Sequence, residues 1–239
     1  MPSAPRHAAE AALIDALQRA QALYAARDAD AGLARSLDRL ADWQSRRLGA
    51  TYADLAAQPR YAAAIEFFRT DLYGSVDYAR RDADVARVTP LMAAMLPERV
   101  IATIGDAMEL NVLSHELDRK LLGHLASRER YGVREYCVAY RATGEYAARE
   151  RQIATIGVIG GALDVFVRKP LIRGALMMMR GPAHFAGFGV LHDFLERGFL
   201  AFQRMGGADE FLATIASRES AIHRAIAAGS NDPFPAPAD

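Results

Sequence analysis

The sequence predicts an all-α protein, a single-domain bundle of about eight to ten helices, and three observations carry this prediction. Of the 239 residues, 51% are apolar, which is enough for one large core. Alanine is abundant, whereas valine, isoleucine and threonine are sparse outside a few places, a bias typical of helices. Apolar residues also recur three and four positions apart in nearly every long segment, as they do on the buried face of a helix.

In the first half of the chain, helices are expected over residues 10–26, 31–48, 61–73 and 78–96. Pro59 separates the second helix from the third, because it supplies no amide hydrogen. The third helix is expected to bury Phe68 and Leu72 and to end at Gly74, after which Ser75 or Asp77 can cap the next. Within the fourth, Pro90 is expected to kink or split the helix.

In the second half, helices are expected over residues 97–126, 133–141, 146–168, 183–205 and 208–227. Pro170 and Pro182 bracket a methionine-rich segment at 177–179. Residues 153–167 are the most apolar stretch and predict a buried core helix, in which glycines 157, 160 and 161 let a neighbouring backbone approach closely. Residues 1–228 therefore form the domain, and the proline-rich tail 229–239 has no periodicity and is predicted to be disordered.

Charge and cysteine content set the expected surroundings of the protein. Lysine plus arginine equals aspartate plus glutamate at 29 each, so the strong basic field of a nucleic-acid binder is missing. The single cysteine, Cys137, excludes an internal disulfide and fits a reducing cytosol. The N-terminus lacks the layout of a signal peptide, and residues 153–167 are too short and contain Asp164, so no membrane span is expected. A cytoplasmic location is the expectation.

Several stretches resemble the bacterial FFLEELY-motif protein family, over a region from about Trp43 to Glu219. The stretches are 43–44, 51–55, 67–74, 80–84, 109–118, 194–199 and 205–212. The sequence departs from the motif that gives the family its name, since Arg69, Thr70 and Asp71 replace leucine and two glutamates. The resemblance implies a cytosolic proteobacterial protein of an uncharacterised family, and it supplies no catalytic residues.

Motif spacing excludes several common chemistries. No glutamate has a histidine three positions later, as a di-iron bundle requires. His115 and Glu116 begin like a zinc-protease helix, but Arg119 stands where the second histidine belongs. A haem-attachment motif, a glycine-rich phosphate loop and a nucleophile elbow are also missing. No cofactor and no metal site is therefore predicted from motifs.

One helix places polar residues on its apolar face. Over residues 97–126, Asn111, His115 and Asp118 are neighbours at helical spacing within the apolar centre, and Arg81 and Glu219 point inward from two other helices. An ionised aspartate there needs a partner, and a histidine beside it tends to be held protonated or in one tautomer. Two interpretations stay open: a polar network that fixes helix register, or a catalytic site with His115 as proton carrier and Asp118 orienting it.

A second candidate site lies near residue 190. His184 falls on the apolar stripe of the expected 183–205 helix, and His192 sits one turn before Glu196 at its edge. His184 is expected to be a buried, hydrogen-bonded core residue, or else an axial ligand in a haem-like pocket walled by Phe185, Phe188 and the methionines 177–179.

Three functions follow from these features. The favoured one is a non-catalytic binding or interaction module, whose apolar helix faces take a protein partner or a small hydrophobic ligand. The second is an enzyme that uses the cluster around His115 and Asp118. The third is haem or metal binding through His184 or His192. The sequence leaves open whether the protein is a homo-oligomer.

Overall fold

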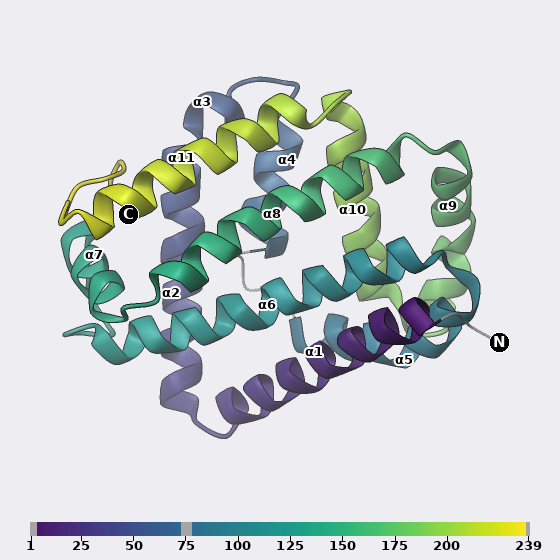
Figure 1. Cartoon of the computed structure of the whole chain (residues 1–239), viewed down its shortest axis with the longest axis horizontal. Helices are drawn as coiled ribbons and strands as arrows, with labels where there is room; N and C mark the ends of the chain where they lie inside the picture. Colours follow the sequence, from purple (N-terminus) through teal and green to yellow (C-terminus); the bar gives the residue numbers. More distant parts are fainter. Residues whose placement is uncertain (1–3, 73–77, 238–239) are drawn as a thin grey trace.

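The computed structural model describes residues 4–72 and 78–237, and within these ranges every regular element is helical. The all-α prediction is confirmed. One layer holds four long helices, α1 (Ala4–Asp28), α6 (Glu98–His124), α8 (Tyr146–Val167) and α11 (Asp209–Ala227). Behind them cross α2 (Ala31–Thr51), α4 (Ala62–Phe67) and α10 (Gly189–Met205) (Figure 1).

The remaining helices close the edges of the two layers. They are α3 (Ala53–Ala56), α5 (Tyr78–Met95), α7 (Val133–Ala142) and α9 (Pro170–Phe185). Helix α5 packs on α1 and continues across Pro90, so the predicted split does not occur there. Helices α7 and α9 lie at opposite ends of the molecule (Figure 1). None of the helices in the described ranges is long and apolar enough to cross a membrane.

Local chemistry explains where several helices begin and end. Asp30 caps α2, because its carboxylate accepts hydrogen bonds from the backbone amides of Gly32 and Leu33 at 2.8 and 3.0 Å. Pro97 precedes the first turn of α6. Gly206 ends α10 with a φ of 64°, a left-handed conformation that glycine adopts without strain.

The predicted 183–205 helix is wrong at its start. Helix α9 runs through Pro182 to Phe185, and α10 begins only at Gly189. Between them Gly187 has a φ of 83°, so the chain leaves the helical path and α10 starts in a new direction. This loop brings the last helical turn of α9 beside the first helical turn of α10.

A π-helical turn, η1 (Phe68–Leu72), follows α4 and changes which side chains face inward. Leu72 was expected in the core but is 40% exposed, whereas Asp71 is buried. In a π-helical turn each backbone hydrogen bond spans five residues instead of four. The side chains after Phe68 therefore point in other directions than they would on a regular α-helix. The buried Asp71 carboxylate accepts a hydrogen bond from Arg197 Nε at 2.9 Å. The predictions for Gly74, Ser75 and Asp77 lie outside the described residues.

Helix α8 is only half buried, which corrects the prediction of a core helix. Val158 is 63% exposed on its outer face. A side chain at Gly160 would meet Leu212, so close packing is confirmed there. At Gly157 and Gly161 an added Cβ would meet no atom within 4 Å, so those two glycines play no such role.

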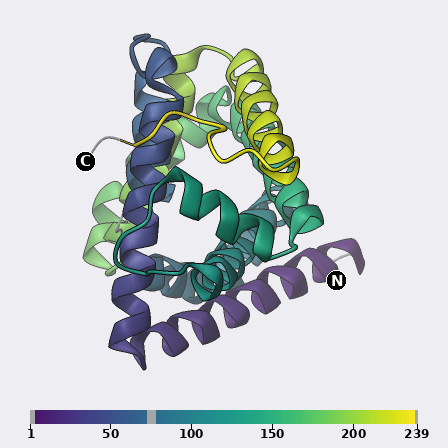
Figure 2. The same ribbon diagram turned by 90° about the vertical axis from the view of Figure 1, so that its left-hand side faces the viewer.

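The tail after α11 crosses α2 on the way to the C-terminus (Figure 2). No regular structure is assigned over residues 230–237, yet Phe234 is buried and its ring lies 6.2 Å from that of Trp43. The guanidinium of Arg47 lies over the Phe234 ring at 4.9 Å. Trp43 is therefore a core residue, and the tail covers it. Cys137 is buried nearby in the same cluster, and burial raises the pKa of its thiol to about 11.

Candidate functional site

Three of the five residues in the predicted polar cluster meet around a carboxylate that the sequence analysis missed. Asp82 on α5 is fully buried and accepts hydrogen bonds from Tyr24 Oη (2.6 Å), Arg81 Nε (2.9 Å) and Asn111 Nδ2 (3.0 Å). Asn111 also donates to Tyr24 Oη at 2.7 Å. These contacts join α1, α5 and α6, and the charge of Asp82 is matched by Arg81.

His115 borders this group, with its ring packed edge-on against Tyr24 at a centroid distance of 5.4 Å. Burial lowers the pKa of His115, and this outweighs the opposite influence of the carboxylates of Asp118 and Asp82. The imidazole is therefore neutral at pH 7. Of the two predicted states, the lowered pKa favours a neutral ring held in one tautomer over a protonated ring, because the desolvation of the cation outweighs the attraction of the nearby carboxylates.

The other two predicted residues, Asp118 and Glu219, belong to a second group. Arg47 donates two hydrogen bonds to the Glu219 carboxylate, at 2.8 and 2.7 Å, and Tyr52 Oη donates a third at 2.8 Å. Burial alone would raise the pKa of Glu219, but the charge of Arg47 and these bonds outweigh it and leave that pKa lowered. Asp118 accepts a hydrogen bond from Gln44 Nε2 at 2.9 Å, and burial raises its pKa.

Asp118 and Glu219 line one small cavity of about 70 Å³, and His223 lines it too. Arg149 reaches it from α8, where its Nη1 donates to Gln152 at 3.0 Å while its buried Nε has no hydrogen-bond partner. A space of this size holds about two water molecules, whereas sites for small organic ligands occupy about 300–1,000 Å³. The five predicted residues thus divide between two groups, and no substrate-sized space lies between Asp118 and Glu219.

The predicted pocket around His184 is not formed. The Phe185 side chain is 97% exposed, so it walls nothing, and the Phe188 ring instead lies under the Arg87 guanidinium at 4.4 Å. His184 is exposed rather than buried, because the turn at 186–188 removes it from the stripe of α10. His192, in contrast, is buried.

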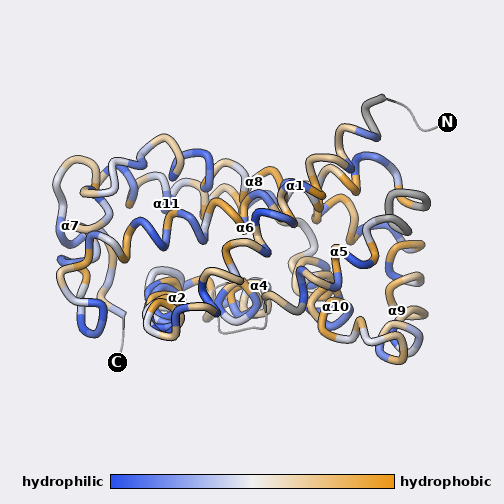
Figure 3. The backbone as a smooth tube through the Cα atoms, turned by 90° about the horizontal axis from the view of Figure 1, so that it is seen from below, coloured by the Kyte–Doolittle hydropathy of each residue, from blue (hydrophilic) through white to orange (hydrophobic). Residues whose placement is uncertain are grey.

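Helix α9 carries an exposed apolar surface that no sequence motif marked. Its inner side contacts the bundle through partly buried Ile172 and Leu176. Its outer side presents large apolar side chains to solvent, with Leu171 at 89%, Met178 at 76% and Phe185 at 97% exposure. Figure 3 shows this helix at one end of the molecule, with hydrophobic residues along it. Surfaces of this kind mark interaction sites in soluble domains.

A groove of about 520 Å³ runs beside α9, between the ends of α8 and α10. Its apolar lining includes Val167, Pro170 and Met177, and two arginines, Arg168 and Arg173, stand along it. Its volume lies within the range of small-molecule sites.

Comparison with known families places the chain in one of them. The model of a family described as a domain of unknown function (DUF8198) matches residues 23–233. The chain belongs to this family. The DUF8198 match includes every stretch that resembles the FFLEELY-motif proteins, and that narrower resemblance stays a prediction. Comparisons with curated proteins and with solved structures find no match.

Proposed function

We propose that this DUF8198 protein is a non-catalytic interaction module, that the outer face of α9 is its binding surface, and that this face binds a second copy of the chain. The observation that carries the proposal is the row of exposed apolar residues on α9. The row consists of Leu171, Ala175, Met178, Pro182 and Phe185. We call it the α9 seam.

The spacing of the α9 seam suits a partner helix. Its members alternate four and three residues apart, which is the spacing of the contact positions in a pair of packed helices. At 100° per residue all five fall within about 60° of the position of Met178. Gly174 and Gly181 flank the row, so another backbone can approach closely on that side.

The α9 seam is also self-complementary. Met178 lies seven residues after Leu171 and seven before Phe185. A two-fold axis through Met178 would therefore place Leu171 of one copy opposite Phe185 of the other, as a symmetric dimer requires. Arg173 and Arg180 project to the opposite side of the helix at 100° per residue, so pairing two seams brings no like charges together.

Cysteine cross-linking tests this geometry directly. Met178→Cys should form a disulfide-linked dimer with itself under mild oxidation, since the axis passes through it. Leu171→Cys and Phe185→Cys should cross-link in a mixture of the two variants and much less alone. The native Cys137 is buried and gives little background. Val138→Cys, an exposed valine on α7 at the other end of the molecule, is the matched control.

Sedimentation velocity supplies the second measurement. The wild type should dimerise at micromolar concentration, and Met178→Glu should be a monomer with unchanged circular dichroism, because a charge in the apolar contact lacks a partner. A wild type that stays monomeric at about 100 μM, or cysteine pairs that react no faster than Val138→Cys, would refute the dimer. A third result would also refute the dimer: a monomeric wild type that binds lipid vesicles, with binding abolished by Met178→Glu. That result would assign the α9 seam to membrane binding.

The groove beside α9 favours a second candidate function, the binding of a small hydrophobic ligand. Its apolar lining suits a hydrocarbon body, and Arg168 and Arg173 suit an anionic head group. A fluorescent fatty-acid probe should bind the wild type and be lost from Met177→Glu. Equal probe binding by both proteins would remove this candidate.

A further inference from the structure

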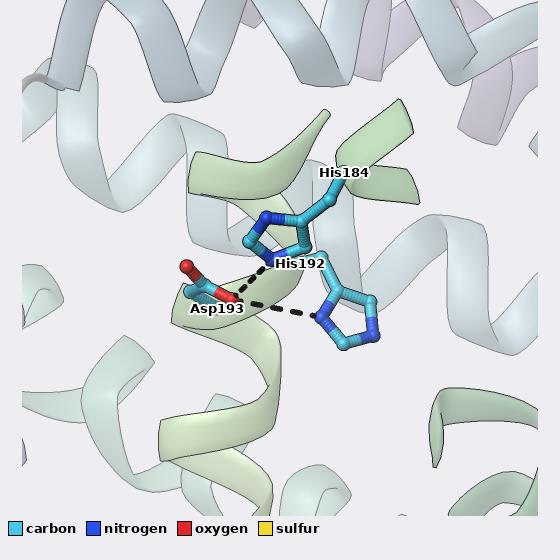
Figure 4. A group of neighbouring side chains, drawn as sticks. All are labelled: His184, His192 and Asp193. Carbon is cyan, nitrogen blue, oxygen red and sulfur yellow. Dashed lines mark hydrogen bonds and ion pairs between the residues drawn. The ribbon is translucent and has the colours of Figure 1, made fainter. Parts of the chain in front are cut away.

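The junction of α9 and α10 brings together three side chains that can hold a metal ion. His184 comes from the last turn of α9, and His192 and Asp193 from the first turns of α10. One ligand atom from each lies within 4.8 Å of the other two. Figure 4 shows both histidines turned toward Asp193. The positive φ of Gly187, 83°, directs the chain so that the two helices meet in this way.

His192 has one nitrogen satisfied and one that is not. Its Nε2 donates a hydrogen bond to the backbone carbonyl of Leu176 at 2.9 Å, because a carbonyl can only accept. In the neutral ring, Nδ1 is therefore a lone-pair acceptor. This nitrogen is buried on a side chain that is 5% exposed, and it has no hydrogen-bond partner. A buried polar atom of this kind calls for an explanation.

The surroundings of His192 Nδ1 indicate what is needed there. Two carboxylate oxygens lie close to it, Asp193 Oδ1 and Glu196 Oε2, each 3.9 Å away. Neither can donate a hydrogen bond when ionised, so a lone pair faces negative charge in a buried place. The hydrogen bond from His184 Nε2 to Asp193 Oδ1, at 2.8 Å, keeps one of these carboxylates in position. A cation between these atoms would satisfy the His192 lone pair and the carboxylates, and His184 Nε2 would become a ligand once its proton moves to Nδ1 or is released.

We propose that this junction is a binding site for a divalent transition-metal ion, held by His184 Nε2, His192 Nδ1 and Asp193, with Glu196 as the fourth ligand. Two imidazoles and two carboxylates are a donor set that suits Zn²⁺ and its neighbours. Tetrahedral bonds of about 2.1 Å place ligand atoms about 3.4 Å apart. The ligand atoms of His184, His192 and Asp193 lie 2.8 to 4.8 Å apart, and Glu196 Oε2 lies 3.9 Å from His192 Nδ1, so side-chain rotations can bring them to that geometry.

The hydrogen bonds around the ligands support the proposal. Metal-binding histidines usually donate their other N–H group to a carbonyl or carboxylate, as His192 does to Leu176. Arg180 lies 3.8 Å from Glu196 Oε2 and orients that carboxylate from outside. The site does not depend on the proposed dimer, although it ties the end of the α9 seam to the body of the protein.

Zn²⁺ titration by calorimetry, with Co²⁺ absorption as a second readout, tests the site. The wild type, purified in the presence of chelator and dialysed, should bind one ion per chain and melt at a higher temperature when loaded. His184→Gln and Asp193→Asn alter partly exposed side chains and should each weaken binding at least about tenfold while leaving the fold intact. His124→Gln, an exposed histidine at the end of α6, should bind like the wild type.

Gly189→Ala provides a test that keeps all four ligands. A Cβ at this position would lie 2.8 Å from His184 Nδ1, so it displaces the ring and should weaken Zn²⁺ binding. Two results would overturn the proposal. One is a wild type that binds no Zn²⁺ at micromolar concentration. The other is Zn²⁺ binding that His184→Gln and Asp193→Asn leave unchanged, which would place the ion elsewhere on the chain.

Discussion

Replacing Glu219 with glutamine tests whether the buried Arg47–Glu219 pair holds α2 to α11. The carboxylate accepts two hydrogen bonds from Arg47 and one from Tyr52, and both charged side chains are mostly buried, at 13% and 19% exposure. Glutamine keeps the shape but leaves the guanidinium without a counter-charge. Breaking such a pair costs about 3–5 kcal/mol, and about 2–4 °C per kcal/mol for a chain of this length gives a fall of roughly 6–20 °C in melting temperature.

The assay is equilibrium unfolding in urea at pH 7, compared with Glu210→Gln on the same helix. Glu210 pairs with Arg60 at 3.1 Å, but both side chains are largely exposed, so this control should lose less than about 1 kcal/mol. The double variant Arg47→Met/Glu219→Gln should regain part of the loss, because no charge is then left buried and unpaired.

The pH dependence gives a second check on the same pair. The pKa of Glu219 is lowered in the folded protein, whereas the pKa of a glutamate in an unfolded chain is about 4.3. The pair's stabilisation is therefore fully present above that pH and is lost as the pH falls through the folded pKa. The difference between wild type and Glu219→Gln should shrink as the pH drops below about 4. A loss under about 1 kcal/mol at pH 7, or a loss that does not change with pH, would refute the buried pair.

Three other predictions concern α8, His115 and the tail. Gly157→Ala and Gly161→Ala should each raise the free energy of unfolding by about 0.5–1 kcal/mol in urea, because alanine favours helix and both sites are open. Gly160→Ala should raise the free energy of unfolding by less, since its methyl group would meet Leu212 of α11. Equal increases for all three variants would contradict that packing. In NMR titrations His115 should titrate below about 6.5, because burial disfavours the cation. Its folded pKa lies below its unfolded one, so it destabilises the fold as the pH falls below about 6.5, and His115→Gln should remove that part of the pH dependence. Phe234→Ala should lose up to about 3 kcal/mol, and unchanged stability would mean that the tail does not pack on Trp43.

The two histidine-containing sites show why the sequence located residues better than it located their partners. Helical spacing correctly identified Asn111, His115 and Asp118 as inward-facing, because 3.6-residue periodicity is a local property. It could not show that Asp82 and not Asp118 receives the hydrogen bond of Asn111, since that depends on how α5 lies against α6. The sequence places His184 wrongly, because periodicity alone predicts one helix over residues 183–205, whereas the chain leaves the helical path at Gly187.

The naming motif of the resembling family shows the same limit at a smaller scale. A regular α-helical phase predicts that Leu72 packs in the core together with Phe68. The π-helical turn at Phe68 shifted this phase, so that Asp71 is buried against Arg197, on a helix far along the chain. The contacts of this turn come from distant parts of the chain, since Ser45 on α2 donates a hydrogen bond to the Arg69 carbonyl and Arg197 on α10 donates to Asp71.

The sequence by itself determined the helical fold, the approximate extent of most helices and the apolar or polar character of their faces, because these depend on residues within a few turns of each other. Only the tertiary structure decided which faces stay uncovered. Ile172 and Leu176 are partly buried on α9, while Leu171 and Phe185, equally apolar, face solvent. Which apolar side of a helix meets the bundle depends on where all the other helices lie, and that information is spread over the whole chain.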